Sequence, residues 1–442
     1  MNERYIAAIE VSSSKIVAAI GKTNGTGMLD IVAVEHESTA EGGVRYGIIQ
    51  NLEDTSISVS RIFSRLEQRN GIHPRKIKSV IVGLGGRSLK NITKEVSLSL
   101  PEDTEITDDI LDRLQEQAIH SAIDNTLEVV DAVPRVFKVG TSRTYSPKGM
   151  VGNHISGIFD LIVCRPELKR NIRRTIIDKL HLEVDGFVVT AMATGHLILS
   201  PEEKRLGCML VDMGSETTTV TIYQKGALHY FATLPLGGRN ITRDIASLGV
   251  VDTKAEEIKI TSGNALAESN VPNLNINGLK LADILNLVVA RSEEIVANII
   301  AQIEYAGIKD SDLPGGIVCI GGGFRMKGLL ELLEMESGIS VRPGTLPDYV
   351  RIDDNRVSGA AIEEVASVLY EGATLTSKES LYMPERTAMP ANGVLPLDTE
   401  EEEEETKDRA TKTKPGFFEK MGKKIGSLFS ANDDDDTELL DE

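Results

Sequence analysis

The stretches "YIAAIEVSSSKIVAAIGK" (residues 5–22) and "GCMLVDMGSETTTVTIYQKGAL" (residues 207–228) are two versions of one pattern. In each, an apolar run ends at an acid, Glu10 or Asp212, and a turn of small polar residues leads into a second apolar run. Short apolar runs joined by a tight polar turn predict β-hairpins. The sequence therefore predicts the same hairpin twice, once in each half of the chain.

The two turns have residue types that suit a phosphate group. Backbone N–H groups in a tight turn, together with hydroxyl groups, form a concave site for an anion. A hydrated Mg²⁺ prefers carboxylates and water, which Glu10 and Asp212 can supply. Two ordinary hairpins that bind nothing remain the alternative at this point. The candidate phosphate-binding residues are Ser12, Ser13, Ser14 and Lys15 in the first turn and Gly214, Ser215, Glu216 and Thr217 in the second.

A glycine triplet forms a third element of this pattern. In "GGIVCIGGGFRMKGLLELLE" (residues 315–334), an apolar strand leads into Gly321, Gly322 and Gly323. Glycines permit close approach of the backbone to a ligand, and a helix N-terminus favours anions. We expect an amphipathic helix directly after the triplet and a nucleotide near it.

The order of these elements resembles the actin, Hsp70 and sugar-kinase superfamily, and the resemblance covers about residues 5–375. "FVVTAMATGHLIL" (residues 187–199) and "RVSGAAIEEVASVLYEG" (residues 356–372) would be its two connecting helices. The resemblance implies an α/β, actin-like two-lobed fold. Duplicated ribonuclease-H-like domains would surround a nucleotide cleft, with ATP and Mg²⁺ as the expected cofactors.

Further segments look like the FtsA family, the actin-like proteins of bacterial cell division. They are "TLPLGGRNITRDIASLGV" (residues 233–250), "AEEIKITSGNA" (residues 255–265) and a strand–helix–strand–strand region at about residues 86–164. The resemblance implies that Glu256 and Lys259 contact the ribose. It adds Gly237, Gly238 and Met326 to the expected nucleotide-binding residues.

This resemblance also implies a division of the chain into subdomains. The first-lobe core would comprise residues 1–85, 164–200 and 355–386, with an inserted α+β subdomain at 86–163. The second-lobe core would comprise 201–236 and 314–354, with a smaller subdomain at 237–313. A disordered acidic linker (387–414), an amphipathic membrane-targeting helix (415–430) and an acidic tail (431–442) would follow.

Composition excludes several classes of protein. The formal net charge is −19, which disfavours nucleic acid as a partner because phosphate contacts dominate that affinity. Three widely spaced cysteines in apolar runs predict buried thiols in a reducing compartment rather than a metal site. The sequence has neither a signal-peptide pattern at its start nor an apolar stretch of about 18 residues. We therefore expect a protein that is neither exported nor membrane-spanning.

The segment "KPGFFEKMGKKIGSLFS" (residues 414–430) is basic and apolar within this acidic chain. Its pattern is typical of a helix lying on an anionic membrane surface, and folding back onto the body is the alternative. One such helix is a weak anchor, but self-association would multiply its affinity. The acidic runs at 400–405 and 433–436 are solvated segments or attenuators of binding. The expected membrane-binding residues are Phe417, Phe418, Lys420, Met421, Lys423, Lys424, Ile425, Leu428 and Phe429.

The FtsA resemblance implies a peripheral protein on the cytoplasmic face of the cell membrane at the division site. Such a protein would polymerise into actin-like filaments, anchor FtsZ filaments and recruit later division proteins. Arg291 stands where the family pairs an arginine with an acid of the FtsZ C-terminal peptide. A surface ion pair with Glu293 or Glu294 is the alternative for Arg291.

The two turns depart from the superfamily's usual pattern, which affects the expected chemistry. Glu10 replaces an aspartate, Ser12 replaces a glycine, and Ser215 and Glu216 stand in a turn that is usually rich in glycine. These changes leave nucleotide binding plausible and predict at most a slow ATPase, without an assigned catalytic residue. Glu183, Asp185 and His196 are not evidently aimed at a substrate. The alternatives are a pilus-assembly adaptor of the same superfamily or a soluble small-molecule kinase.

Overall fold

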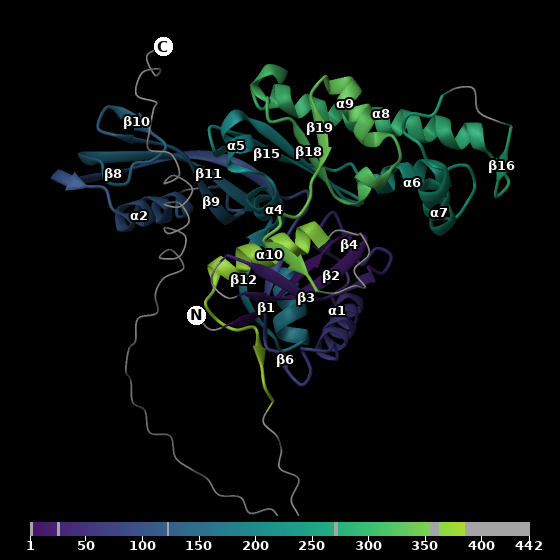
Figure 1. Cartoon of the computed structure of the whole chain (residues 1–442), viewed down its shortest axis with the longest axis horizontal. Helices are drawn as coiled ribbons and strands as arrows, with labels where there is room; N and C mark the ends of the chain where they lie inside the picture. Colours follow the sequence, from purple (N-terminus) through teal and green to yellow (C-terminus); the bar gives the residue numbers. More distant parts are fainter. Residues whose placement is uncertain (1–2, 24–26, 122, 269–272, 354–361, 385–442) are drawn as a thin grey trace, which may run out of the picture.

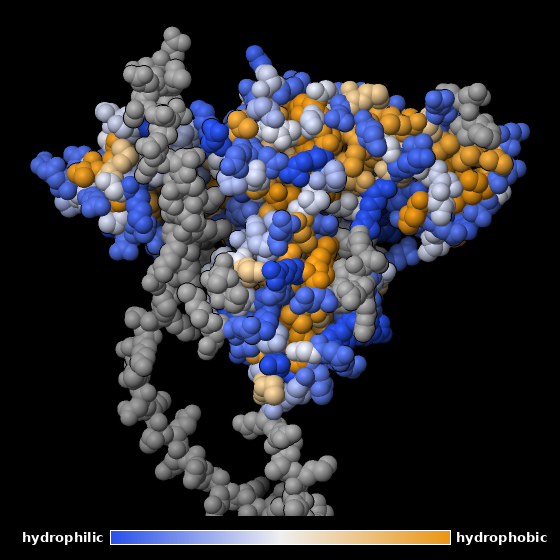
Figure 2. Space-filling model, in the orientation of Figure 1, coloured by the Kyte–Doolittle hydropathy of each residue, from blue (hydrophilic) through white to orange (hydrophobic). Residues whose placement is uncertain are grey.

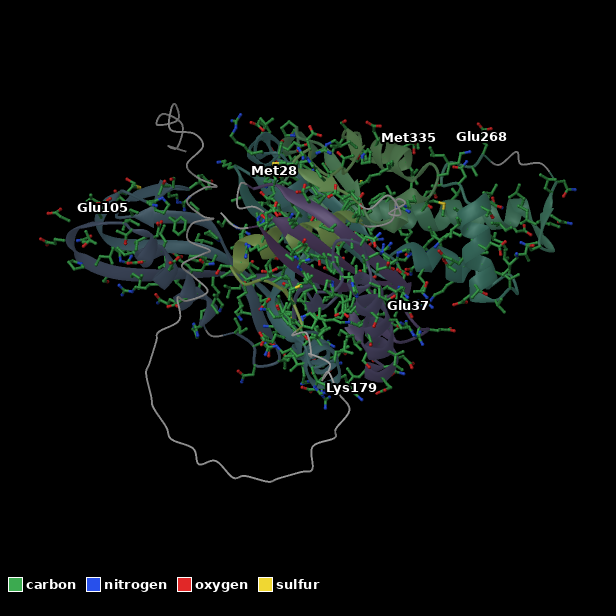
Figure 3. The ribbon with its side chains drawn as sticks, turned by 60° about the horizontal axis from the view of Figure 1, so that its bottom comes forward. Met28, Glu37, Glu105, Lys179, Glu268 and Met335 are labelled. Atoms are coloured by element: carbon green, nitrogen blue, oxygen red, sulfur yellow. The ribbon has the colours of Figure 1, made fainter. Side chains whose placement is uncertain are left out.

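The computed structural model describes residues 3–23, 27–121, 123–268, 273–353 and 362–384, which form two lobes with an inserted subdomain (Figure 1). Glu105, in the inserted subdomain, and Glu268, in the second lobe, lie at opposite ends of the molecule (Figure 3). The inserted subdomain and the second lobe therefore extend to opposite sides above the first lobe (Figure 1). Hydrophilic residues cover much of this face, with hydrophobic patches both near the middle and at the two ends (Figure 2).

The first lobe is built on a six-stranded sheet in the order β12-β7-β1-β2-β3-β20. Strands β1 and β2 form the predicted antiparallel hairpin, and β7 pairs with β1 in parallel. The bounds are β1 (Arg4–Val11), β2 (Lys15–Thr23), β3 (Leu29–Ser38), β7 (Ser79–Leu84), β12 (Glu183–Val189) and β20 (Val350–Ile352). Short pairs lie beside this sheet: β4 (Val44–Arg45) with β5 (Ile48–Ile49), and β6 (Lys76–Ile77) with β21 (Leu381–Tyr382).

Helices cover the first-lobe sheet. Helix α1 begins after Asn51, whose side chain accepts hydrogen bonds from the amides of Glu53 and Asp54 and so caps the helix. Helix α10 packs on β1 and β2, where Gly21 leaves room for Leu369. It also packs on α4, so the two predicted connecting helices cross each other. The bounds are α1 (Leu52–Glu67), α3 (Pro166–Arg173) with its π-helical continuation η1 (Arg174–Lys179), α4 (Thr190–Ile198) and α10 (Ile362–Leu375).

The second lobe repeats the arrangement on a five-stranded sheet in the order β15-β14-β13-β18-β19. Strand β13 is antiparallel to β14 and parallel to β18, as β1 is to β2 and β7. The predicted duplication of the hairpin is thus confirmed. The strands are β13 (Cys208–Met213), β14 (Thr218–Gln224), β15 (Ala227–Leu234), β18 (Ile317–Ile320) and β19 (Val341–Pro343).

The helices of the second lobe form most of its smaller part. The long helix α8 buries one apolar face that includes Ile284, Val288, Ile295 and Ile299 against α6 and neighbouring elements. The elements are α5 (Pro201–Leu206), α6 (Gly238–Ala246), α7 (Asp252–Ser262), β16 (Asn275–Ile276), β17 (Leu279–Lys280), α8 (Leu281–Tyr305), η2 (Asp310–Asp312), η3 (Gly322–Arg325) and α9 (Leu329–Ser337).

The inserted subdomain has its own four-stranded sheet, in the order β10-β9-β11-β8, with α2 packed against it. Phe137 and Phe159 meet edge to face in its core, with ring centroids 5.9 Å apart. The predicted order of strand, helix, strand and strand is confirmed, with the short β10 added. The bounds are β8 (Lys90–Glu105), α2 (Asp108–Ile119), β9 (Glu128–Val139), β10 (Ser142–Thr144) and β11 (Val151–Cys164).

One arginine joins the inserted subdomain to the second lobe. The guanidinium of Arg135 donates two hydrogen bonds of 2.8 Å to the buried carboxylate of Asp160, within the subdomain. It also donates to the carbonyl of His229 on β15 at 2.9 Å. The imidazole of His229 in turn lies 3.0 Å from the carbonyl of Ala306, just after α8. The subdomain is therefore connected in sequence to the first lobe, where Lys169 of α3 also pairs with Glu128 of β9, and is bonded to the second lobe as well.

Two predictions about local structure are wrong. The glycine triplet opens a 3-10 turn, and the following helix begins only at Leu329, after Gly328 in the left-handed conformation (φ +79°). The short strand at Val350–Ile352 falls in the predicted second-lobe core, yet it pairs with β3 of the first lobe. The chain has already crossed back between the lobes after β19.

All three cysteines are buried and unpaired, as predicted. Burial raises the pKa of Cys164 to about 11 and that of Cys208 to about 12. Within the residues that the structure describes, no helix is long and apolar enough to cross a membrane. The predicted linker, amphipathic helix and acidic tail (387–442) lie outside the described residues.

Candidate functional site

A cavity lies between the two lobes, where the turns of the two hairpins face each other. The volume of this cavity is about 210 Å³. Fifteen of the predicted nucleotide-binding residues line it: Glu10, Ser12, Ser13, Ser14, Lys15, Asp212, Gly214, Ser215, Glu216, Thr217, Gly238, Glu256, Lys259, Gly322 and Gly323. Residues separated by more than 300 positions in the sequence thus meet in one site.

The turn of the first hairpin is closed by its own polar groups. The amide and the hydroxyl of Ser12 both donate to the carbonyl of Lys15, at 2.9 and 2.8 Å. Thr39 donates its hydroxyl to the Ser12 carbonyl and its amide to the Ser14 carbonyl. The Ser12 side chain, which stands where a glycine is usual, therefore serves the turn itself.

The turn of the second hairpin is held by α6 and by the other lobe. The amides of Gly238 and Arg239 donate to the carbonyls of Gly214 and Ser215, which fixes the turn to the start of α6. The carboxylate of Glu216 accepts a hydrogen bond from the amide of Tyr46 in the first lobe. Glu216 is therefore not an unpaired negative charge facing a phosphate.

Three carboxyl groups gather at the inner end of the cavity. Burial raises the pKa of Glu10 to about 7, and the nearby charge of Asp212 adds to the effect while Lys15 opposes it. Burial raises the pKa of Asp212 to about 6, against a hydrogen bond with Glu364 and the charge of Lys15. Burial and the charges of Glu10 and Asp212 raise the pKa of Glu364 well above its usual range. This arrangement disfavours three negative charges unless a cation is present.

The acids fit the magnesium ion that the sequence predicts. Glu10 Oε2 and Asp212 Oδ1 are buried and have no hydrogen-bond partner in the described part of the chain. Among those residues, no group of three or more His, Cys, Asp or Glu side chains is arranged as a metal site. Mg²⁺ is commonly held by only one or two carboxylates, together with water and phosphate. The unpaired oxygens of Glu10 and Asp212 suit that kind of coordination.

The second lobe contributes a polar network on the side of the cavity away from the acids' strands. Lys259 Nζ lies 2.7 Å from Glu256 Oε2, 2.9 Å from Thr242 Oγ1 and 3.1 Å from the Gly238 carbonyl. The hydroxyl of Thr242 also donates to the Glu256 carboxylate. This network holds Lys259 and Glu256 in place, so the cavity has one positively and one negatively charged side chain that can contact a sugar or a phosphate.

The glycine triplet serves two purposes. A Cβ on Gly321 (φ +91°) would lie 2.6 Å from Asp212 Oδ1 and 2.5 Å from the Met213 carbonyl, so this glycine lets β18 pack beside the acid. A Cβ on Gly322 would meet nothing within 4 Å, so this residue faces open space. A Cβ on Gly323 would meet Met213 at 2.4 Å. Packing against β13 therefore requires two of the three glycines, and the middle one leaves the cavity clear.

Three of the predicted nucleotide-binding residues are not part of the cavity lining: Gly237, Gly321 and Met326. Gly237 supports the second turn, since a Cβ there would lie 2.5 Å from the Ser215 carbonyl. The sulfur of Met326 lies beside Gly263, at the end of α7. These residues adjoin the cavity but do not face it.

Several cavity residues were missed by sequence reasoning. Glu364 on α10 is the most important of them, and Thr190 and Ala191 at the start of α4 also line the cavity. The signal for Glu364 was its place among apolar residues on the buried face of an amphipathic helix. The others missed from the first lobe and β15 include Gly47, Gly85, Gly86 and Phe231.

The residues considered as possible bases lie elsewhere. Glu183 and Asp185 are near Lys378, 3.9 and 3.6 Å from its Nζ, at the end of β12 that is far from Thr190. His196 lies 3.2 Å from Glu371, where α4 meets α10. None of the three lines the cavity.

Arg291, the predicted partner-binding residue, lies on α8 and is already engaged within the lobe. Its guanidinium makes a two-point contact with Asp244 of α6, at 2.6 and 3.0 Å, and a further ion pair with Glu294. An acid from another protein would have to replace or join Asp244.

Comparisons with known proteins agree with this architecture. A family model described as "Cell division protein FtsA" matches residues 209–363, and "SHS2 domain inserted in FTSA" matches residues 86–163. The chain is 28% identical to "Cell division protein FtsA" of Pseudomonas aeruginosa over 79% of this chain and 86% of that protein. It is 28% identical to the Bacillus subtilis protein of the same description over 80% of this chain and 81% of that one.

Among solved structures, a chain of the "PilM-PilN type IV pilus biogenesis complex" superposes with a TM-score of 0.58. The superposition covers 83% of this chain and 98% of that one at 15% identity. At that identity the likeness concerns the fold alone. The predicted actin-like α/β fold is confirmed.

Proposed function

Because the chain belongs to the FtsA family of actin-like cell-division proteins, we propose that it binds ATP with Mg²⁺ between its lobes and anchors FtsZ filaments to the membrane. The cavity would hold the nucleotide, and self-association into actin-like filaments would bring many copies to the cytoplasmic face of the membrane. Later division proteins would join that assembly. At 28% identity, the two relatives named above support the division role in its general form.

One observation carries the nucleotide proposal. Both hairpin turns, both acids, Glu256 and Lys259 line a single cavity, and Thr242 hydrogen-bonds to the last two. The turns of the two hairpins would bind the phosphates, and Lys259 and Glu256 would position the sugar. Glu10 and Asp212 would hold Mg²⁺, which neutralises phosphate charge when bound.

The same geometry favours binding over fast turnover. A hydrolytic site needs a base or an amide aimed at the attacking water. The first connecting helix presents Thr190 and Ala191 to the cavity, and its His196 lies beside Glu371 instead. We therefore propose a slow ATPase at most, in which bound nucleotide controls lobe closure.

Membrane attachment would come from the basic, apolar segment at residues 414–430, outside the described residues. A lysine near an anionic surface contributes about 1 kcal/mol, so one such segment binds weakly. Filament formation would raise the avidity by orders of magnitude, about 10²–10⁴. Anchoring would then depend on assembly.

Liposome co-sedimentation tests this proposal. Full-length protein and a chain ending at Thr413 would be mixed with anionic vesicles, each with and without Mg-ATP. We expect only the full-length protein to pellet, and more of it with ATP. Equal recovery of both forms in the supernatant would contradict the membrane role.

FtsZ binding can be tested separately through Arg291, which the Asp244 carboxylate holds on the surface of α8. We expect a synthetic FtsZ C-terminal peptide to bind, and Arg291→Glu to abolish binding by repelling the acid of the peptide. Arg61→Glu, on the first-lobe helix α1, is the control, because Arg61 pairs with Glu37 of the same lobe. Peptide binding that survives Arg291→Glu would contradict this assignment.

A further inference from the structure

Glu216, in the turn of the second hairpin, has a buried carboxylate at the edge of the cavity. Its side chain is only 2% exposed, although the turn borders an open cavity. Burying a carboxylate is costly unless hydrogen bonds and cations compensate for the lost water. The partners of Glu216 therefore indicate what the residue does.

Those partners come mainly from the opposite lobe. The amide of Tyr46 donates to Glu216 Oε2 at 2.7 Å, and Arg45 Nε lies 2.9 Å from Glu216 Oε1. Both residues belong to the first lobe. A second arginine, Arg243 of the same lobe as Glu216, is more distant, at 3.5 Å. The carboxylate thus bridges the lobes.

The first-lobe segment that receives Glu216 is rigidly placed. Tyr46 and Gly47 both have positive φ values, 50° and 84°, which form a tight turn between β4 and β5. A Cβ on Gly47 would lie 2.2 Å from the carbonyl of Gly85, so the turn packs directly on the strand end that lines the cavity. The amide of Arg87 donates to the Tyr46 carbonyl, and its guanidinium stacks 4.4 Å from the Tyr46 ring centroid. These contacts attach the turn to the neighbouring strand end of its own lobe.

Opening of the cleft must therefore break the contacts of Glu216. Gly47, Gly85 and Glu216 all line the cavity, so the bridge between the lobes is part of the cavity wall. A separation of the lobes by a few ångströms would exceed hydrogen-bond distance to Tyr46 and expose the carboxylate. The Tyr46 contact is a charge-assisted hydrogen bond and the Arg45 contact an ion pair, and buried contacts of these kinds mainly slow dissociation.

We propose that Glu216, Arg45 and the Tyr46 amide form a clasp that holds the lobes together and limits the rate at which nucleotide enters and leaves the cavity. This inference rests on the proposed nucleotide function for its role in exchange. The clasp itself is a contact of the protein alone. The clasp also gives a function to Glu216, which stands in a turn that is usually rich in glycine.

The first experiment measures the dissociation rate of a fluorescent ATP analogue from full-length protein, chased with excess Mg-ATP. Glu216→Gln and Arg45→Met remove the ionic part of the clasp from opposite sides. We expect each to raise the dissociation rate by about tenfold or more, and the double variant to be no faster than the faster single one. Unchanged rates in both single variants would overturn the proposal.

Arg243→Met is the matched comparison. Arg243 approaches the same Glu216 oxygen with nearly the same exposure as Arg45, but it lies in the same lobe as Glu216. A clasp between lobes predicts a much smaller change for Arg243→Met than for Arg45→Met. Equal acceleration by the two arginine variants would show a local charge effect and overturn the clasp.

Amide hydrogen exchange of residues 44–49 separates failure of the clasp from failure of the nucleotide function. In nucleotide-free protein, the Tyr46 amide is protected by Glu216, and Glu216→Ala should accelerate its exchange while leaving the β1–β2 hairpin unchanged. If no nucleotide binds but this protection is lost in the variant, the clasp stands and the nucleotide function fails. If nucleotide binds and protection is unaffected, the clasp is overturned.

Discussion

The two hairpin turns share a pattern but use their polar groups differently. In the first turn, the Ser12 hydroxyl donates to Lys15 and the Ser13 hydroxyl accepts from Gly47, all within the first lobe. In the second turn, the Glu216 carboxylate is bound by the opposite lobe. The two hairpins therefore share a strand arrangement, but the side chains in their turns contact different parts of the molecule. The first turn maintains its own shape, and the second connects the lobes.

The largest expected effect concerns how the second turn is supported. Gly237 has an extended backbone, yet an added Cβ would lie 2.5 Å from the Ser215 carbonyl and 2.7 Å from that of Gly214. Gly237→Ala should therefore lower the free energy of unfolding by about 2–3 kcal/mol through overpacking. Chemical denaturation would measure it. Gly322→Ala is the control, because its Cβ meets open space and stability should hardly change.

Lys259 tests how much the second lobe contributes to nucleotide affinity. Hydrogen bonds to charged groups contribute about 1.5–3 kcal/mol, so Lys259→Met should weaken ATP binding roughly tenfold to a hundredfold. Calorimetric titration would measure this. Lys254→Met is matched, since Lys254 pairs with Glu257 on the same helix with similar spacing. Equal losses in the two variants would show a general effect of charge on α7.

The buried acids Glu10, Asp212 and Glu364 should make the stability of the protein depend on pH, and a Glu364 variant tests this. The folded-state pKa values of Glu10 and Asp212, about 7 and 6, exceed their ordinary values of 4.5 and 3.8. The folded protein therefore binds more protons between about pH 4 and pH 7, and this cluster's contribution to stability falls as pH rises through that window. Glu364→Gln removes one of the repelling charges. In metal-free buffer it should stabilise the protein by about 1–2 kcal/mol at pH 8 and by little at pH 4.

Thermal unfolding at both pH values checks this prediction. Glu363→Gln is the control, since the neighbouring side chain is less buried on α10. A stabilisation by Glu364→Gln that is the same at pH 4 and pH 8 would contradict the electrostatic explanation.

The smallest effect belongs to the first turn. Ser12→Ala removes one partly buried hydrogen bond, to the Lys15 carbonyl, and should cost about 1 kcal/mol of stability. Ser14 is exposed, so Ser14→Ala should change the unfolding midpoint much less. Protection of the Tyr46 amide from hydrogen exchange should be unchanged in Ser12→Ala, because this turn does not bridge the lobes. Loss of that protection in Ser12→Ala would remove the distinction between the two turns.

The sequence predicted those parts of the site that repeat or follow a local pattern. The hairpins were recognisable from their alternation, and the meeting of Glu10 with Asp212 followed from the duplication. Glu364 was not recognised because two adjacent glutamates near the start of a helix are usually solvated. Its burial depends on how α10 packs on α4 and the first-lobe sheet, with Asp212 of the second lobe beside it, which no local pattern encodes.

The clasp was also beyond sequence reasoning. Arg45 ends the two-residue strand β4 and Tyr46 lies in the turn before β5, and their partner Glu216 is 170 positions away from Tyr46 in the chain. The glycine triplet was misread for a related reason. In the sequence, a glycine that leaves space for a ligand looks the same as one that permits packing against β13. Only the atoms around Gly321 and Gly323 show that these two serve packing.

The bond from Arg135 to the His229 carbonyl has a mechanical consequence. The inserted subdomain leaves the first lobe after β7 and re-enters it before α3, while Arg135 bonds it to β15 of the second lobe. It is therefore attached to both lobes, and a rotation between them must either break the Arg135 bond or turn the subdomain. A small rotation between the lobes would tilt the far end of the subdomain, near Glu105, through a larger arc. A change in the cleft could thus be transmitted along the whole length of the molecule.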